Sequence, residues 1–187
     1  MPPVANANYA WILHMLSKLD VSHGIAGFLL ANGALNADGD EFTLRKEILE
    51  KDRVEAIIVL PRNMFYSTDI SVTLWILNNN KKGGPWHGRQ LRNRAGEILF
   101  IDLRTWNSNI YEKKYVRLAE AEINRVRQIY FNWQTENFAE YAEPELYYAA
   151  HRDEIQEKGY SLVPSRYIEF VDRDTEIDYQ SALSEMS

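Results

Sequence analysis

The sequence contains no cysteine, and this absence excludes two kinds of architecture. Without thiols the chain can form neither a disulfide framework nor a thiolate zinc site. Nothing at the N-terminus resembles a signal peptide, and no apolar run approaches the roughly 20 residues needed to cross a bilayer. We therefore expect a cytoplasmic protein without a membrane span.

Catalytic signatures are also scarce. The chain has no GxSxG nucleophile elbow, no Walker phosphate loop and no GxGxxG motif. The histidines are scattered without a pair at ligand spacing, so we expect no metal site. The net charge of -6 argues against a protein that coats nucleic acid by bulk electrostatics, although a local basic patch can still contact it. The motifs alone do not indicate a self-contained enzyme.

What the sequence does contain is enough apolar material for one sizeable domain, with 45% hydrophobic residues in 187. Helical and strand periodicities alternate along its first half, which is typical of an α/β layer with a parallel sheet and a hairpin-like strand at one edge. We expect helices over 9–19, 44–52 and 116–135, a buried parallel strand over 24–31, and further strands over 54–60, 70–77 and 97–103.

The stretch from Val54 to Asn78 organises this pattern. Two β-branched runs flank a short polar turn that begins at Pro61 and contains Phe65 and Tyr66. In α/β proteins, ligands bind at loops that leave the carboxyl ends of strands. Two interpretations of the aromatic pair stay open: the rings fold back on the core, or one of them is a stacking platform for a base.

A second segment, 78–96, combines glycines with five basic residues and no acidic one. It is either a solvated loop, the usual meaning of such composition, or a contact to DNA phosphates. Its basic side chains are Lys81, Lys82, Arg89, Arg92 and Arg94.

Four stretches together resemble a known family. They are GFLLANGAL, LRKEILEKDRVEAIIVLPRNMFYSTDISVTLWIL, ILFID and GYSLVPSRYIEF. Their order and approximate spacing are similar to those of the M, or modification, subunit of type I restriction-modification systems, an N6-adenine DNA methyltransferase. The resemblance covers the chain from about Tyr9 to about Asp178.

The resemblance implies a fold and a division of the chain. It implies the C-terminal half of a Rossmann-like, S-adenosylmethionine-dependent methyltransferase sheet with flanking helices and a helical, aromatic C-terminal extension. We expect an untethered start over 1–8, the α/β half-domain over 9–104, the helical extension over 105–178 and a tail over 179–187.

The resemblance also implies site residues. Phe65 or Tyr66 would stack on the extruded target base, and no catalytic residue would lie in this chain. The cleft would be lined by Asn32, Gly33, Pro61 and Asn63. No role for the basic segment 81–94 is carried over, because it varies within the family.

Two family motifs are missing from the sequence: the S-adenosylmethionine-binding glycine motif and the Asn-Pro-Pro-Phe tetrapeptide. We therefore expect a fragment, inactive alone, that binds no S-adenosylmethionine by itself. The expected partners are DNA, the specificity and restriction subunits, the missing N-terminal half, and a second copy through an exposed strand edge near 24–31. The alternative hypothesis is a non-catalytic interaction module that docks a specificity subunit or a second copy.

Overall fold

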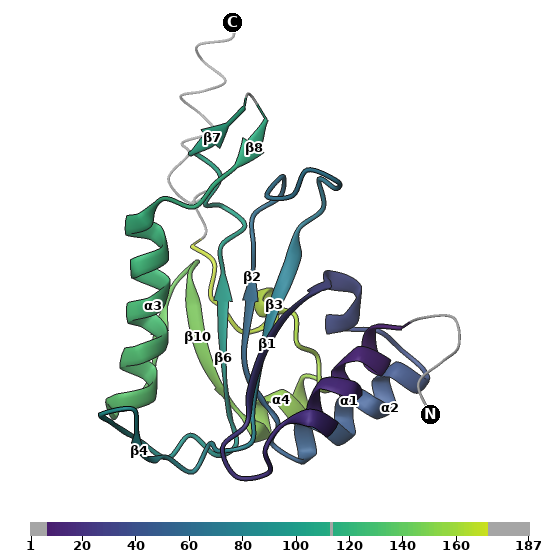
Figure 1. Ribbon diagram of the computed structural model, residues 1–187, viewed down its shortest axis with the longest axis vertical. Helices are drawn as coiled ribbons and strands as arrows, with labels where there is room; N and C mark the ends of the chain where they lie inside the picture. Colours follow the sequence, from purple (N-terminus) through teal and green to yellow (C-terminus); the bar gives the residue numbers. More distant parts are fainter. Residues whose placement is uncertain (1–6, 113, 172–187) are drawn as a thin grey trace, which may run out of the picture.

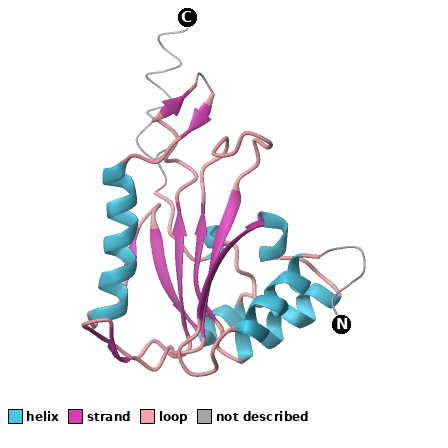
Figure 2. Ribbon diagram, viewed as in Figure 1, coloured by secondary structure: helices cyan, strands magenta, loops and turns pink. Residues whose placement is uncertain are grey.

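The computed structural model describes residues 7–112 and 114–171, and these form one six-stranded sheet between two helical layers (Figures 1 and 2). The expected tail over 179–187, and most of the expected start over 1–8, lie outside the described residues. None of the helices in the described part of the chain is both long and apolar enough to cross a membrane.

The described chain contains six helices or helical turns and ten strands. The helices are α1 (Asn8–Lys18), the 3-10 turn η1 (Asn32–Leu35), α2 (Asp40–Glu50), α3 (Glu120–Thr135), α4 (Arg152–Glu157) and the 3-10 turn η2 (Pro164–Arg166). The strands are β1 (Ile25–Ala31), β2 (Val54–Val59), β3 (Val72–Asn78), β4 (Gly84–Trp86), β5 (Arg89–Leu91), β6 (Glu97–Asp102), β7 (Ile110–Tyr111), β8 (Tyr115–Val116), β9 (Ala142–Glu143) and β10 (Tyr147–His151).

The sheet is mixed, so the expectation of a parallel sheet is wrong. Its order is β1-β3-β2-β6-β10-β9, and only β2 and β6 run parallel. The short 60–71 turn makes β3 return antiparallel beside β2, as the hairpin pattern predicted, and β1 pairs antiparallel with β3. The strand expected to be buried and parallel is therefore an edge strand with every second residue exposed.

Side chains of the central strands alternate between two apolar cores, as the pleat requires. Ile57, Trp75 and Phe100 face α1, α2 and α4. Ile58 and Leu99 face the other way, onto α3. The sheet is thus covered on both faces, which fits the near-continuous apolar runs of β2 and β6.

The segment expected as a helical extension also builds the sheet. Tyr148 of β10 pairs with Phe100 of β6, and β9 pairs with β10 at the edge. The sequence patterns indicated α3 but missed α4, β9, β10 and the small β7–β8 hairpin. Strands of two to five residues are too short for a periodicity to be recognised.

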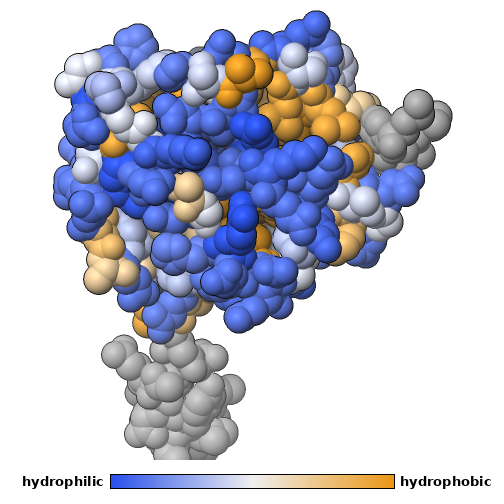
Figure 3. All heavy atoms as spheres, turned by 90° about the horizontal axis from the view of Figure 1, so that it is seen from below, coloured by the Kyte–Doolittle hydropathy of each residue, from blue (hydrophilic) through white to orange (hydrophobic). Residues whose placement is uncertain are grey.

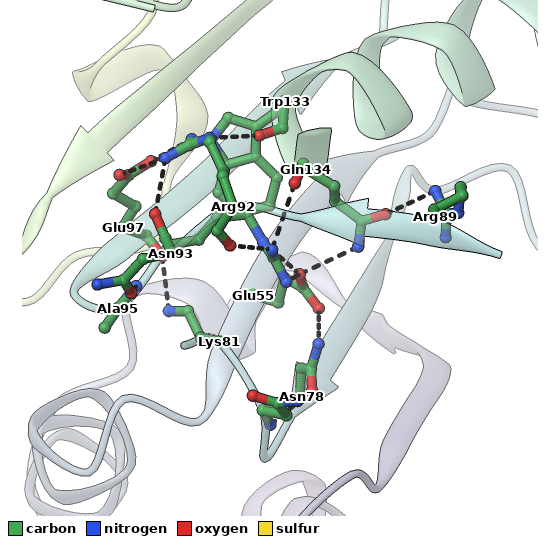
Figure 4. Close-up of polar contacts among 12 residues, drawn as sticks. Glu55, Asn78, Lys81, Arg89, Arg92, Asn93, Ala95, Glu97, Trp133 and Gln134 are labelled. Carbon is green, nitrogen blue, oxygen red and sulfur yellow. Dashed lines mark hydrogen bonds and ion pairs between the residues drawn. The ribbon is translucent and has the colours of Figure 1, made fainter. Parts of the chain in front are cut away.

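A β-bulge in β2 places a carboxylate inside the protein. The pairing with β3 shifts register between Val54 and Ala56, so Glu55 is the extra residue, and its side chain points toward α3 (Figure 4). Glu55 is fully buried and accepts hydrogen bonds from Arg94 at 3.0 and 3.1 Å and from Gln134 of α3 at 3.2 Å. The amide of Asn78 donates to its other oxygen. This network connects β2, β3, α3 and the segment before β6.

We predict that Arg94→Ala lowers the free energy of unfolding by about 3 to 5 kcal/mol, because it leaves the Glu55 carboxylate buried without a compensating charge. Urea denaturation measures the change. The matched control is Arg62→Ala, which removes an ion pair whose side chains are 67% and 68% exposed. The control should cost less than about 1 kcal/mol. Equal effects of the two substitutions would contradict the role given to the buried pair.

Candidate functional site

The predicted site residues that follow strands lie at one end of the sheet, which we call the upper rim. It comprises residues 32–33 after β1, 60–71 between β2 and β3, and 103–109 after β6; Figure 1 draws the 60–71 turn above the strands and the helical turn after β1 lower, at mid-height. The pairing of Ala31 with Val72 and of Val59 with both Thr73 and Asp102 brings these segments to the same edge. The rim includes the carboxyl ends of the parallel pair, where α/β folds bind ligands.

The 60–71 turn is closed by its own backbone. Leu60 N–H donates to Val72 at 2.9 Å, and Asn63 N–H donates to Asp69 at 3.3 Å. Asn63 adopts a left-handed conformation with φ 60°, which asparagine tolerates better than most residues. Pro61 is buried and Asn63 is half-buried, and the expected role of both in lining a cleft stays a prediction. The missing N–H of Pro61 ends the pairing of β2, and its ring packs inward.

The two aromatic residues of the turn differ in exposure. Phe65 is half-buried and forms an isolated bridge with Thr68, whereas Tyr66 is 68% exposed. Neither ring is sunk in the interior, and both lie beyond the carboxyl end of β2. Stacking on a base stays a prediction, and Tyr66 is the residue of the pair that offers an open ring.

Asn32 and Gly33 lie on the same rim, at the start of η1. Asn32 Oδ1 accepts a hydrogen bond from the Thr73 hydroxyl at 2.6 Å, which holds the side chain beside the first residues of β3. Gly33 is exposed, and open space surrounds the position that a Cβ would occupy. Their role in lining a cleft stays a prediction.

The β7–β8 hairpin adds aromatic residues that the sequence analysis missed. Val116 N–H donates to Asn63 C=O at 2.9 Å, and the Tyr115 ring lies 4.5 Å from the Tyr66 ring. Partial desolvation, and then the nearby Glu112 carboxylate, raise the pKa of Tyr66. The available signal was the pair of tyrosines at 111 and 115, flanked by Ile110 and Val116.

The basic segment lies at the opposite end of the sheet, between the end of β3 and the start of β6. The structure therefore does not bring it together with Tyr66. Figure 3 looks at this lower end and shows a mainly hydrophilic surface with apolar atoms gathered along one margin. Most basic side chains of the segment do not face this surface freely, because they are engaged inside the protein.

Lys81 and Arg94 are buried, so both the expected phosphate contacts and the expected solvated loop are wrong for them. Lys81 Nζ donates to Asp52 at 2.5 Å and to the carbonyls of Val54 and Glu97. Burial lowers the pKa of Lys81, an effect that the Asp52 carboxylate opposes. The acidic partners come from outside the segment, which is why its own composition did not reveal the pairing.

Arg92 and Arg89 are engaged as well. Arg92 makes a two-bonded ion pair with Glu97 at 2.6 and 2.8 Å, so a phosphate role for it is not supported (Figure 4). Arg89 is half-buried and lies over the Phe131 ring at 4.2 Å. Lys82 is exposed. For Lys82 and Arg89, contact with phosphate stays a prediction.

A sequence profile described as N-6 DNA Methylase matches residues 1–176. The chain belongs to this N6 DNA methylase family. Its relatives include the type I restriction enzyme MjaIX methylase subunit of Methanocaldococcus jannaschii, 32% identical over all of this chain and 32% of the relative. The HindI methylase subunit of Haemophilus influenzae is 34% identical over 89% of this chain and 35% of the relative. The chain thus spans about a third of the length of these curated relatives.

A solved structure agrees with the methylase fold. The type I restriction-modification methyltransferase subunit of Streptococcus thermophilus superposes with a TM-score of 0.75 and 24% identity, covering 91% of this chain and 32% of that one. The resemblance to type I M subunits is therefore confirmed, as is an α/β fold of that type. In this chain, the sheet of that fold is mixed, as described above.

N6 methyltransferases normally use S-adenosylmethionine. The residues described do not fit that group. No glycine-rich turn joins a strand to a helix along the upper rim of the described chain, and the Gly33 backbone forms no close cradle that a Cβ would fill. Acidic and histidine side chains within 7–112 and 114–171 also form no group of three placed to hold a metal ion.

The ion pair of Glu97 predicts a pH dependence of stability. Burial alone would raise the pKa of Glu97, but the hydrogen bonds and charge of Arg92 lower it below its ordinary value of 4.5. A carboxylate with a lowered folded-state pKa stabilises the protein above its unfolded-state pKa, and this contribution is lost as the pH falls through the folded-state pKa.

We therefore expect the free energy of unfolding to fall as the pH drops below about 4.5, and to fall less steeply in Glu97→Gln. Urea denaturation over a pH series measures both slopes. Glu157→Gln, at an exposed position in α4, is the control for the loss of one carboxylate. Parallel curves for wild type and Glu97→Gln would show that the pair with Arg92 does not set this dependence.

Proposed function

We propose that this chain supplies the target-base side of an N6-adenine DNA methyltransferase cleft in a type I restriction-modification methylase subunit. The observation that carries the proposal is the exposed Tyr66 ring at the carboxyl end of β2, on the upper rim. Membership of the N6 DNA methylase family supplies the reaction class. The fold supplies the position, because the rim includes the carboxyl ends of the one parallel pair in the described sheet.

The chemistry explains why an aromatic ring belongs there. An enzyme that modifies a base must take it out of the duplex, and the extruded base needs a surface that replaces its lost stacking. Tyr66 offers that surface, and the half-buried Phe65 precedes it in the same closed turn. Asn32 and Gly33 line the neighbouring part of the rim. The role of this chain is therefore positioning, which is a large part of catalysis when two reactants must be aligned.

The methyl-donor side lies on polypeptide of the subunit beyond these 187 residues. Two observations support this: the glycine and Asn-Pro-Pro-Phe motifs are absent from the sequence, and the chain spans about a third of its curated relatives. The chain alone is then inactive and binds no S-adenosylmethionine. Its partners are DNA, the rest of the methylase subunit, and the specificity and restriction subunits of the type I complex.

We expect Tyr66→Ala, in a complete methylase subunit that contains this chain, to lower DNA methylation about 10-fold or more, because one stacking ring is worth roughly 1 to 3 kcal/mol. Phe65→Ala should have a smaller direct effect on the base and a larger effect on stability, since Phe65 is half-buried. Methyl transfer to target DNA measures the first effect, and urea denaturation measures the second.

The control for this test is Trp11→Ala, which removes an aromatic ring that is 56% exposed on α1. Binding of S-adenosylmethionine should be nearly unchanged in Tyr66→Ala. If donor binding and methylation fall together, the substitution has damaged the fold. If methylation is unchanged, Tyr66 does not hold the base and the proposal loses its main support.

A second function is favoured by the edge of the sheet. β1 leaves one strand edge unpaired within the described residues, and Ile25 and Leu29 on it are 43% and 45% exposed. Beside it, a cavity of about 270 Å³ is lined in part by Gly27, Leu74 and Ile76. Such an edge is a template for association. The chain would then be an interaction module that docks a specificity subunit or a second copy.

This second function predicts that the 187-residue chain self-associates in light scattering, and that Ile25→Lys with Leu29→Lys gives a monomer, because charges on an edge strand oppose pairing. Ile123→Lys, at a position 53% exposed on α3, is the matched control and should leave association unchanged. A monodisperse wild-type monomer would remove the second copy as an occupant of this edge.

A further inference from the structure

Three tyrosine rings gather where the β7–β8 hairpin packs on the 60–71 turn of the upper rim. Tyr66 comes from the 60–71 turn, and Tyr111 and Tyr115 come from the β7–β8 hairpin. Tyr66 and Tyr111 are 68% and 42% exposed, and Tyr115 is half-buried. Exposed aromatic side chains carry apolar surface that folding has not removed from water. Three in one place indicate a binding surface.

The hairpin is held in place by backbone contacts and is not a free loop. Tyr111 pairs with Tyr115, and Ile110 pairs with Val116. Val116 N–H donates to Asn63 C=O at 2.9 Å, and Arg117 N–H donates to Asn109 C=O at 3.0 Å. These bonds fix the tyrosines relative to the turn that carries Tyr66. The rings therefore form a preorganised surface.

A cavity of about 320 Å³ opens between these rings, within the range of small-ligand sites. None of its lining residues is acidic, and the Glu112 carboxylate lies outside the lining but near the Tyr66 ring. Arg117 lies 5.8 Å from the centre of the Tyr111 ring, and Lys114 lies 4.9 Å from that of Tyr115, so cations accompany the aromatic faces. We call this cavity the tyrosine pocket, and it is lined by Met64, Tyr66, Tyr111, Tyr115, Val116 and Arg117.

Aromatic faces beside Lys and Arg are the combination with which proteins bind unpaired bases, since each ring stacks on a base and each cation attracts phosphate or adds a cation–π contact. A docked apolar peptide would not require the cations. An acidic peptide would leave the ring faces unused. The mixed lining therefore fits an unpaired nucleotide better than either of these.

We propose that the tyrosine pocket binds an unstacked nucleobase of single-stranded or locally opened DNA, with Tyr111 and Tyr115 as stacking residues beside Tyr66. The inference rests on the proposed function and extends it. Extrusion of the target base disrupts base stacking in the DNA, and the tyrosine pocket accepts a base that has lost its stacking partners. Tyr111 and Tyr115 are positioning residues for DNA, and the β7–β8 hairpin is part of the base-side wall.

The test is titration of the 187-residue chain with a short single-stranded oligonucleotide that contains 2-aminopurine, whose fluorescence reports stacking. Wild type should bind it more tightly than the matching duplex. Tyr111→Ala and Tyr115→Ala should each weaken binding about 5- to 100-fold. Tyr111→Phe and Tyr115→Phe should bind like wild type because they keep the ring face. Trp11→Ala is the control for an exposed aromatic residue elsewhere.

Tyr111→Leu and Tyr115→Leu are controls for collapse of the β7–β8 hairpin. Leucine keeps apolar volume at each position but removes the aromatic face. Binding by the leucine variants at the wild-type level would overturn the inference, as would failure of wild type to bind. Loss of contact with a specificity subunit at unchanged oligonucleotide affinity would assign the pocket to protein and also overturn it.

The binding measurement does not depend on methyl transfer, so the two proposals can fail separately. If Tyr66→Ala lowers methylation in a complete subunit while Tyr111→Ala and Tyr115→Ala change neither methylation nor oligonucleotide binding, the proposed function stands and the pocket is wrong. If the tyrosines bind the oligonucleotide but Tyr66→Ala leaves methylation unchanged, the proposed function fails instead.

Discussion

The structure depends on one buried interaction, between Glu55 and Arg94. A carboxylate in the interior is tolerated only when it is paired and its oxygens are hydrogen-bonded, and Glu55 meets both conditions through Arg94, Asn78 and Gln134. These partners come from β3, from the segment before β6 and from α3. The pair therefore holds α3 and the basic segment against the sheet.

The side chains at the two ends of the sheet are engaged differently. At the lower end, cations are engaged by acidic residues and carbonyls, as Lys81 is by Asp52, and the segment is part of the protein's framework. At the upper rim, aromatic rings are left exposed on a turn and a hairpin that bond to each other through Asn63 and Val116. Rigid support at one end and exposed rings at the other are what a surface that positions a substrate needs.

Much of the fold followed from local patterns. The runs of β2, β3 and β6 and the helical stripes of α1, α2 and α3 were predicted within a few residues, because buried strands and amphipathic helices have strong periodicities. The position of Tyr66 beyond a strand end was also predicted, from Pro61 and the turn residues around it. The tyrosine pocket was not, since it forms only when 110–117 packs on 61–71, which no spacing within either segment encodes.

The sequence by itself determined the family, the main elements and the location of an aromatic turn, because all three depend on runs of consecutive residues and on the order of those runs along the chain. Tertiary structure alone decided which charges are buried. Arg94 and Lys81 look like solvated cations until Glu55 and Asp52, about 30 to 40 residues away, are brought beside them. The physical reason is that burial and pairing are properties of three-dimensional neighbours. A single-residue bulge at Glu55 turned its carboxylate toward α3 and chose those neighbours.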